Sequence, residues 1–347
     1  MAEQTALIPI SGCDDPERLA DVIFVHGLDG NARSTWHPKD QPEHFWPAWL
    51  GEEMPQLGVW SLNYAVSALA WKGHSLPLVD RANNVLDLFA LEDIGQRPLA
   101  LICHSLGGLL MKQVLRNARD ALLDPQWQAI VEHTQLMVFL STPHSGANMA
   151  SWISYLGTLL RLTVSIEELE GHHPRLRELN IWYRDHVAGL GIRTFVYYET
   201  LPTGRMLVVD ATTADPGISG VRPIPVDEDH VTICKPASKE TRIYRQVKRL
   251  IGNSILRADR PPASAAGSGH AGDTAKIDIC RRLWPDWQDV ADYFEIPTDQ
   301  RRGFAPGREP QGVWEWLESR ERLSQLAEAL RYIGRDDLAE MLPLPPR

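Results

Sequence analysis

The sequence has few cysteines, and no two of them are closely spaced. The chain of 347 residues contains Cys13, Cys103, Cys234 and Cys280. Zinc sites and redox motifs commonly bring cysteines together in Cys-x-x-Cys pairs, a spacing that does not occur here. We therefore expect four free thiols in a reducing cytoplasm, with neither a disulfide framework nor a metal site.

Basic charge and long apolar runs are also scarce. The formal net charge is -10, which argues against nucleic-acid binding, because that needs a basic surface. Residues 1–10 show no basic region followed by an apolar core, so no signal peptide is predicted. No run approaches the roughly 20 apolar residues of a membrane-spanning helix. These absences favour a globular cytoplasmic protein and leave only peripheral membrane contact open.

One segment has no large apolar residue and divides the chain. Residues 258–276 read ADRPPASAAGSGHAGDTAK and are rich in Ala, Gly, Ser and Pro. Such a composition cannot bury a face and is typical of a flexible linker. We predict one domain over residues 1–257 and a second over residues 277–347, both within the usual size range.

The first domain alternates short apolar strands with amphipathic helices. Strands are expected at residues 21–25, 59–64, 99–103, 136–140, 194–198 and 206–209, and helices at 45–53, 76–91, 106–118 and 242–256. This alternation predicts an α/β fold with a mostly parallel sheet and helices on both faces. Active sites in such sheets lie at the carboxyl ends of the strands.

A candidate nucleophile follows one of these strands. Residues 99–110 read LALICHSLGGLL, an apolar strand that ends near Ser105 and continues as a helix. A strand, a sharp turn at Ser and a helix make up the nucleophile elbow, whose usual pattern is Gly-x-Ser-x-Gly. Cys103 replaces the first Gly, and we expect the turn to tolerate this small residue. The alternative is a buried structural Ser in an ordinary strand–turn–helix.

The expected chain order Ser, acid, His points to a general base near the end of the domain. His230 lies in the polar loop VDEDHVT after the last predicted strand and before the last helix, where the base is expected. A solvated loop histidine is the alternative. His26, His74 and His144 are rivals, but two precede Ser105 and His144 follows too early a strand. We predict wall or capping positions for these three.

Two carboxylates compete for the role of orienting the base. Glu199 ends the predicted strand at residues 194–198, and Asp210 ends the next one. The penultimate-strand position favours Glu199, with Asp210 as the alternative acid. Asp227 and Asp229 are too close to His230 in the chain to be favoured.

Backbone donors for an oxyanion are expected beside the elbow. The turn VHGLDG at residues 25–30 follows the first clear strand, and its glycines let backbone N–H groups face a ligand. We predict that the amides of Leu28 and Leu106 form an oxyanion hole.

With these residues the sequence resembles the alpha/beta-hydrolase superfamily, and more closely the SERAC1-like serine esterase/lipase group. The resemblance implies an alpha/beta-hydrolase fold, Ser105 as nucleophile, His230 as base and acyl or lipid esters as substrates, and it favours Glu199 as the acid. No cofactor is needed. The matching segments are FVHGLDGNARSTW, LICHSLGGLLMKQVL, FLSTPHSGA, YYETLPT and VDEDHVTICKPAS, in this order between residues 20 and 250.

The bulky apolar segment at residues 152–162 follows the third of these motifs. It predicts either a lid that offers an apolar wall to an acyl chain or an ordinary packing helix.

The tail carries Trp and Leu residues at helical spacing, which predicts a small all-α bundle. The segments WQDVA at residues 287–291 and ALRYIGRDDLA at residues 329–339 resemble a death-like module of bacterial immune effectors. Residues 277–347 hold 10 Arg and 14 Asp or Glu, which suits contact with a partner that bears a similar domain. A solvated bundle surface is the alternative.

Together these features predict a serine esterase or lipase that works through an acyl-enzyme and is recruited by its tail in bacterial antiviral defence. An amidase or protease on the same triad, and a non-catalytic signalling adaptor, are the alternative functions.

Overall fold

The structure is a computed structural model of the whole chain. It describes residues 5–28, 30–64, 78–144 and 173–256, and most of the chain from residue 276 to 342, without 277–278, 281, 285, 305–308, 321 and 340. The chain divides into two compact units, Met1–Pro261 and Pro262–Arg347. Each unit is described by itself. The division falls within the predicted linker, whose bounds at residues 258 and 276 stay a prediction.

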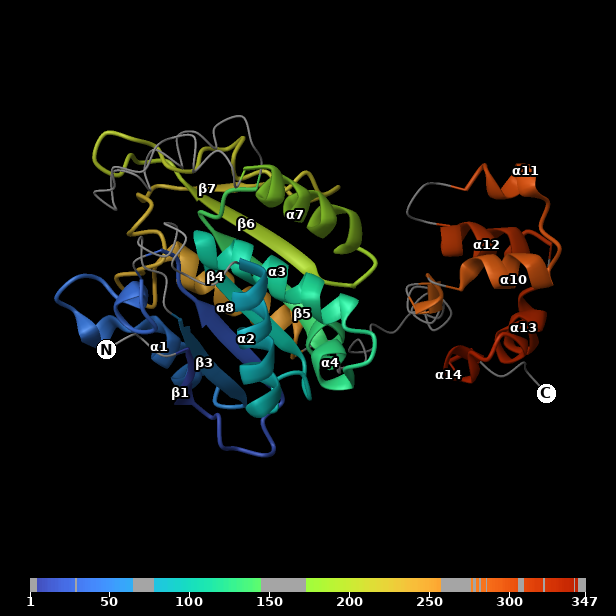
Figure 1. Cartoon of the computed structure of the whole chain (residues 1–347), viewed down its shortest axis with the longest axis horizontal. Coiled ribbons are helices and arrows are strands. Elements are labelled where there is room, and N and C mark those ends of the chain that lie inside the picture. Colours follow the sequence, from blue (N-terminus) through green and yellow to red (C-terminus); the bar gives the residue numbers. More distant parts are fainter. Residues whose placement is uncertain are drawn as a thin grey trace, which may run out of the picture. The chain divides into compact units, whose positions relative to one another are not determined.

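The described part of the first unit contains seven strands and helices that alternate with them (Figure 1). The strands are β1 (Ala6–Ser11), β2 (Ala20–Val25), β3 (Leu57–Asn63), β4 (Leu99–His104), β5 (Thr134–Leu140), β6 (Arg193–Glu199) and β7 (Ile224–Val226). The described helices are α1 (Trp46–Glu53), α2 (Leu78–Leu91), α3 (Leu106–Asp120), α4 (Pro125–His133), α7 (His173–His186) and α8 (Arg242–Ser254), with short 3-10 turns at Ser34–Trp36 and Pro42–His44.

The strands form one sheet in the order β1-β3-β2-β4-β5-β6-β7. Only β1 is antiparallel to its neighbour, and all other pairs are parallel. β2, β4 and β5 are buried along nearly their whole length, as expected for parallel strands that are covered on both faces. The mostly parallel α/β fold with helices on both faces is confirmed.

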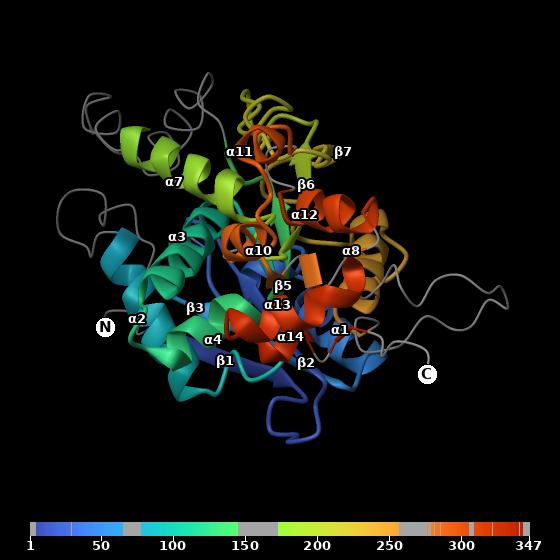
Figure 2. The ribbon, with the colours of Figure 1, turned by 90° about the vertical axis from the view of Figure 1, so that its right-hand side faces the viewer.

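Two apolar cores lie on the two faces of the sheet. Helices α2, α3, α4 and α7 pack on one face and α1 and α8 on the other (Figures 1 and 2). The second core is rich in aromatic rings, and Trp46 is buried against Phe24 with ring centroids 4.6 Å apart. The sheet is thereby held rigidly between two helical layers, so the positions of the strand ends are well defined.

The strand predicted at residues 206–209 is absent. Met206 forms an isolated bridge with Thr203, outside the sheet. The seventh strand of the sheet is β7 instead. Val208 and Val209 are buried in the core, as their apolar character predicted. However, the backbone N–H of Val209 donates to the side chain of Glu199 and not to a neighbouring strand. The Val209 amide is thus not available to pair with a strand, so its burial did not imply a strand at this position.

Several further elements were not predicted from the sequence. β1, α4 and α7 belong to the fold, and β1 is an edge strand that tolerates Pro9. The candidate lid at residues 152–162 and the rival base His74 lie outside the described residues.

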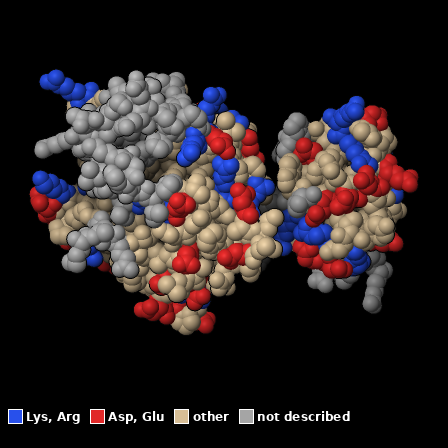
Figure 3. All heavy atoms as spheres, viewed as in Figure 1, with Lys and Arg blue, Asp and Glu red and all other residues tan. Residues whose placement is uncertain are grey.

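The second unit is all-α in its described residues, as predicted. Its helices are α10 (Trp287–Tyr293), α11 (Thr298–Arg301), α12 (Glu309–Glu318), α13 (Leu326–Tyr332) and α14 (Asp336–Ala339), with a 3-10 turn at Leu323–Gln325. They enclose a core of their own that includes Val290, Phe294, Leu317 and Leu330. Side chains of both charge signs lie next to each other on this unit (Figure 3).

All four cysteines are free and buried. In the part of the chain that the structure describes, no helix is long and apolar enough to cross a membrane.

Candidate active site

Ser105 forms a one-residue turn between β4, which ends at His104, and α3, which begins at Leu106. Its backbone has φ 49° and ψ -123°, a conformation that costs a non-glycine residue on the order of 1–3 kcal/mol. Three hydrogen bonds offset this cost. The Ser105 N–H donates to Leu140 O at 2.9 Å, and its carbonyl accepts from Thr142 Oγ1 at 2.9 Å and from the Gly108 N–H at 3.1 Å. The geometry is that of a nucleophile elbow, and the turn forms with Cys103 in the first position.

The His-Gly-Leu turn after β2 lies directly beside this elbow. A Cβ atom on Gly27 would come within 2.8 Å of the Ser105 Cβ, so only glycine fits. Leu28 and Leu106 therefore flank the serine from two elements. Among the hydrogen bonds between described residues, neither the Leu28 nor the Leu106 amide donates to a protein acceptor. Both N–H groups remain available for a substrate oxygen.

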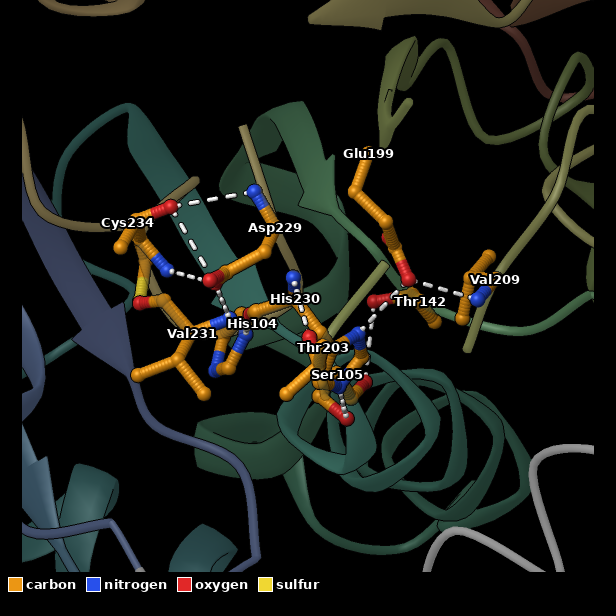
Figure 4. Close-up of polar contacts among 11 residues, drawn as sticks. His104, Ser105, Thr142, Glu199, Thr203, Val209, Asp229, His230, Val231 and Cys234 are labelled. Carbon is orange, nitrogen blue, oxygen red and sulfur yellow. Dashed lines mark hydrogen bonds and ion pairs between the residues drawn. The ribbon is translucent and has the colours of Figure 1, made fainter. Parts of the chain in front are cut away.

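The structure brings together the three side chains that the sequence proposed (Figure 4). The His230 ring lies between the other two: Nε2 is 2.9 Å from Ser105 Oγ, and Nδ1 is 3.2 Å from Glu199 Oε1. Ser105 and His230 are each 3% exposed and Glu199 is fully buried. Because a carboxylate only accepts, Nδ1 carries the proton, and Nε2 can accept the hydrogen bond from Ser105 Oγ.

Glu199 ends β6 and is held by the neighbouring segment. Its Oε1 also accepts from the Val209 N–H at 2.6 Å, which keeps the carboxylate facing His230. The alternative acid Asp210 caps a turn, where its Oδ1 accepts from the Thr213 N–H at 2.8 Å. Asp229 does the same for the N–H groups of Val231 and Thr232, both at 2.8 Å. The contact with His230 Nδ1 favours Glu199.

The two described rival histidines are buried structural groups. The His26 ring stacks on Tyr64 with centroids 4.4 Å apart, and its Nδ1 donates to Gly27 O at 2.8 Å. Burial lowers the pKa of His26 to about 4, an effect that the bond to Gly27 only partly offsets. His144 is bonded through Nδ1 to the buried amine of Lys112. Burial holds the pKa of both of these groups well below its usual range.

Lys112 joins three elements beneath the elbow. Its Nζ also donates to Asn180 Oδ1 on α7 at 2.6 Å and lies 4.9 Å from the centre of the Tyr183 ring. It forms no ion pair within the described part of the chain. The backbone N–H of His144 in turn donates to the backbone oxygen of Thr213 at 2.7 Å. This cluster therefore connects α3, the loop after β5 and the segment that supports Glu199.

Sequence reasoning missed His104, the residue just before the nucleophile. Its Nε2 lies 2.8 Å from the backbone oxygen of His230. Burial, together with the proximity of His230, lowers the pKa of His104 to about 3. The elbow pattern allows any residue at this position, so the pattern itself carried no signal. Thr203 was missed for a similar reason: its Oγ1 accepts from the His230 N–H at 3.0 Å.

These buried imidazoles predict that acid destabilises the protein. In the unfolded chain His26 and His104 take up protons near pH 6.5, whereas in the folded chain they stay neutral down to about pH 4 and pH 3. Stability is therefore lost as the pH falls below about 6.5. Between pH 7 and pH 5 we expect a loss of about 2 kcal/mol for each imidazole, measured by urea unfolding of the full chain.

The matched variant is His26→Gln, which retains a donor and does not titrate. Its stability should fall less between pH 7 and pH 5 than that of the wild type, whatever its absolute stability. Equal slopes for the two proteins would contradict the prediction.

The chain is similar in sequence to two described families and to curated relatives. Residues 16–162 match the family described as "Putative serine esterase (DUF676)", and residues 273–344 match "Bacterial Death-like domain 3". Protein SERAC1 of Danio rerio is 32% identical over 262 residues, which cover 68% of this chain and 39% of the relative. Protein SERAC1 of Homo sapiens is 30% identical over 262 residues, with coverage of 69% and 39%. The chain thus spans about two fifths of the length of these curated relatives.

Among solved structures, Est1E from Butyrivibrio proteoclasticus aligns over 73% of this chain and 96% of its own, with 14% identity and a TM-score of 0.46. The two family matches fall on different structural units, the serine esterase match on the first and the death-like match on the second. The chain is therefore similar in sequence to SERAC1 and to the DUF676 serine esterases, and its C-terminal part is similar to a bacterial death-like domain.

Proposed function

We propose that the first domain hydrolyses carboxylic esters through Ser105, His230 and Glu199. The observation that carries this proposal is the placement of His230, whose two ring nitrogens face Ser105 Oγ and Glu199 Oε1 at 2.9 and 3.2 Å. A serine hydroxyl is a weak nucleophile until a base accepts its proton, and the base works only in the correct tautomer. Glu199 selects that tautomer through Nδ1–H.

The reaction follows in two halves. His230 Nε2 accepts the Ser105 proton as Oγ attacks the ester carbonyl, and the negative charge that develops on the carbonyl oxygen is stabilised by the amides of Leu28 and Leu106. Collapse breaks the bond to the alcohol, which leaves with the proton from His230. Water then attacks the acyl-serine while His230 again accepts and returns a proton, so the carboxylic acid is released and Ser105 is restored. No cofactor takes part in these steps.

We propose acyl or lipid esters as the substrate class. The support is the similarity of sequence to the serine esterase and SERAC1 relatives, together with the apolar segment WISYLGTLLRL at residues 152–162. Paired ester and amide substrates with the same acyl group separate this proposal from the alternative. Hydrolysis of the amide alone would identify an amidase or protease.

We further propose that the death-like domain recruits the hydrolase to a protein partner with a similar domain, in cytoplasmic antiviral defence. The match to a bacterial death-like domain and the presence of a separate apolar core support an interaction module. The mixed Arg and acidic side chains of this unit suit a partner with complementary charges. Defence that survives loss of Ser105 would favour the non-catalytic adaptor.

The test of the hydrolase uses Ser105→Ala with a matched serine variant. Ser141 is the natural control: it also follows a strand, is fully buried, and has φ 49°. A fluorophosphonate probe should label the wild type and Ser141→Ala, but not Ser105→Ala, and ester hydrolysis should follow the same pattern. Equal labelling of all three proteins would refute Ser105 as the nucleophile.

A further inference from the structure

The backbone of His230 is held at both of its polar groups by side chains. Its N–H donates to Thr203 Oγ1 at 3.0 Å, and its carbonyl lies 2.8 Å from His104 Nε2. Because a carbonyl only accepts, His104 Nε2 carries a proton and donates it. The ring that holds the base thus comes from the residue next to the nucleophile.

This contact fixes the distance between the two reacting side chains. His104 and Ser105 are consecutive residues, and the strand end and the strained turn hold both in place. His230 lies in a turn that follows the three-residue strand β7, so the ladder of the sheet gives it little support. The bond from His104 connects this turn to the most rigid part of the site.

The charge state of His104 also matters to its neighbour. The two imidazole rings lie with centroids 5.1 Å apart and tilted by 48°. A cation at that distance would disfavour the imidazolium that must form on His230 during proton transfer. Burial keeps His104 neutral, so it supplies a hydrogen bond without this repulsion.

We propose that His104 is a positioning residue, which sets His230 Nε2 against Ser105 Oγ by donating a hydrogen bond to the backbone of His230. This inference rests on the proposed esterase function and deepens it. A purely structural role is less well supported, because the loop has other anchors. Trp46 Nε1 donates to Cys234 O at 2.9 Å, and Asp229 caps the turn.

The test compares His104→Leu, which cannot donate, with His104→Gln, whose amide can. For a soluble ester we expect kcat of His104→Leu to fall by about 10- to 100-fold, the range that a displacement of about 1 Å can cause. KM should stay within about twofold, and His104→Gln should recover most of the loss. Fluorophosphonate labelling should slow in parallel with kcat.

His133 provides the matched control. Its Nδ1 also bonds a backbone carbonyl, that of Ala129 at 2.9 Å, but His133 ends α4 directly before the amino end of β5, whereas Ser105 follows the carboxyl end of the parallel strand β4. His133→Leu should therefore leave kcat unchanged.

A second readout does not depend on activity. The imidazole signal of His230 in NMR spectra should be single and sharp in the wild type and broadened in His104→Leu. If the wild type is active and His104→Leu matches it in rate and in the His230 signal, the inference is wrong and the esterase proposal stands. If the wild type neither labels nor hydrolyses esters while His104→Leu broadens the signal, the esterase proposal fails and the positioning role stands. Equal losses in both His104 variants with a lower unfolding midpoint would show a structural role and overturn the inference.

Discussion

We expect Glu199→Gln to lower kcat for ester hydrolysis by about 10³- to 10⁴-fold with little change in KM, because the base loses its orienting carboxylate. Glu199 Oε1 lies 3.2 Å from His230 Nδ1 and also accepts from the Val209 N–H. The glutamine side chain can accept from the Val209 N–H only if its Oε1 faces that group. Because it is neutral, it cannot stabilise the imidazolium by charge. The measurement is steady-state hydrolysis of a soluble ester, with fluorophosphonate labelling as a second readout.

Asp210→Asn is the matched carboxylate variant. The Asp210 side chain accepts from the Thr213 N–H at 2.8 Å, and the Asn amide oxygen can make the same bond. We expect kcat within about threefold of the wild type, because a neutral acceptor serves this turn as well as a charged one. A large loss in Asp210→Asn with a small one in Glu199→Gln would transfer the orienting role to Asp210.

Gly107→Ala should destabilise the first domain by about 3 kcal/mol, at the upper end of overpacking effects. A Cβ at this position would lie 2.5 Å from Val25 O and 2.5 Å from His26 O. Both are backbone atoms of the strand end beside the elbow, so neither can rotate away. For a domain of this size the midpoint of thermal unfolding should fall by about 6–12 °C, and the displaced helix should also lower kcat.

Gly252→Ala is the control in another helix. Gly252 lies in α8, where a Cβ would meet only Met54 Cε, at 3.8 Å. Alanine is the better helix former, so we expect unchanged or slightly higher stability, by up to about 1 kcal/mol. Equal midpoints for Gly107→Ala and Gly252→Ala would contradict the account of the elbow.

Much of the site was predictable because strong local patterns mark it. The apolar strand before Ser105 and the helix after it specify the elbow, and parallel strands place their carboxyl ends at one edge. Ser105 directly follows one strand end, Glu199 ends another strand, and His230 lies in the loop beyond a third. The structure brings these residues together as proposed. The sequence favoured Glu199 over Asp210 by its strand position and by the family resemblance, whereas the contact with His230 Nδ1 gives a physical reason.

What the sequence did not reveal depends on contacts between distant segments. Residues 206–209 look like a strand because Val208 and Val209 are apolar, but the Val209 amide is taken by Glu199. β7 has three residues, one of them Pro225, so it is too short to show a period. His104 holds a carbonyl 126 positions away in the chain, a relation that no local pattern encodes.

The burial of the four thiols has a practical consequence. Burial raises the pKa of Cys280 to about 11 and that of Cys234 to about 12, and it raises the pKa of Cys13 and Cys103 as well. Alkylating reagents and oxidants attack the thiolate, which is scarce at neutral pH for all four. A single cysteine introduced on the surface of either domain would thus accept a fluorophore selectively, with every native thiol left in place.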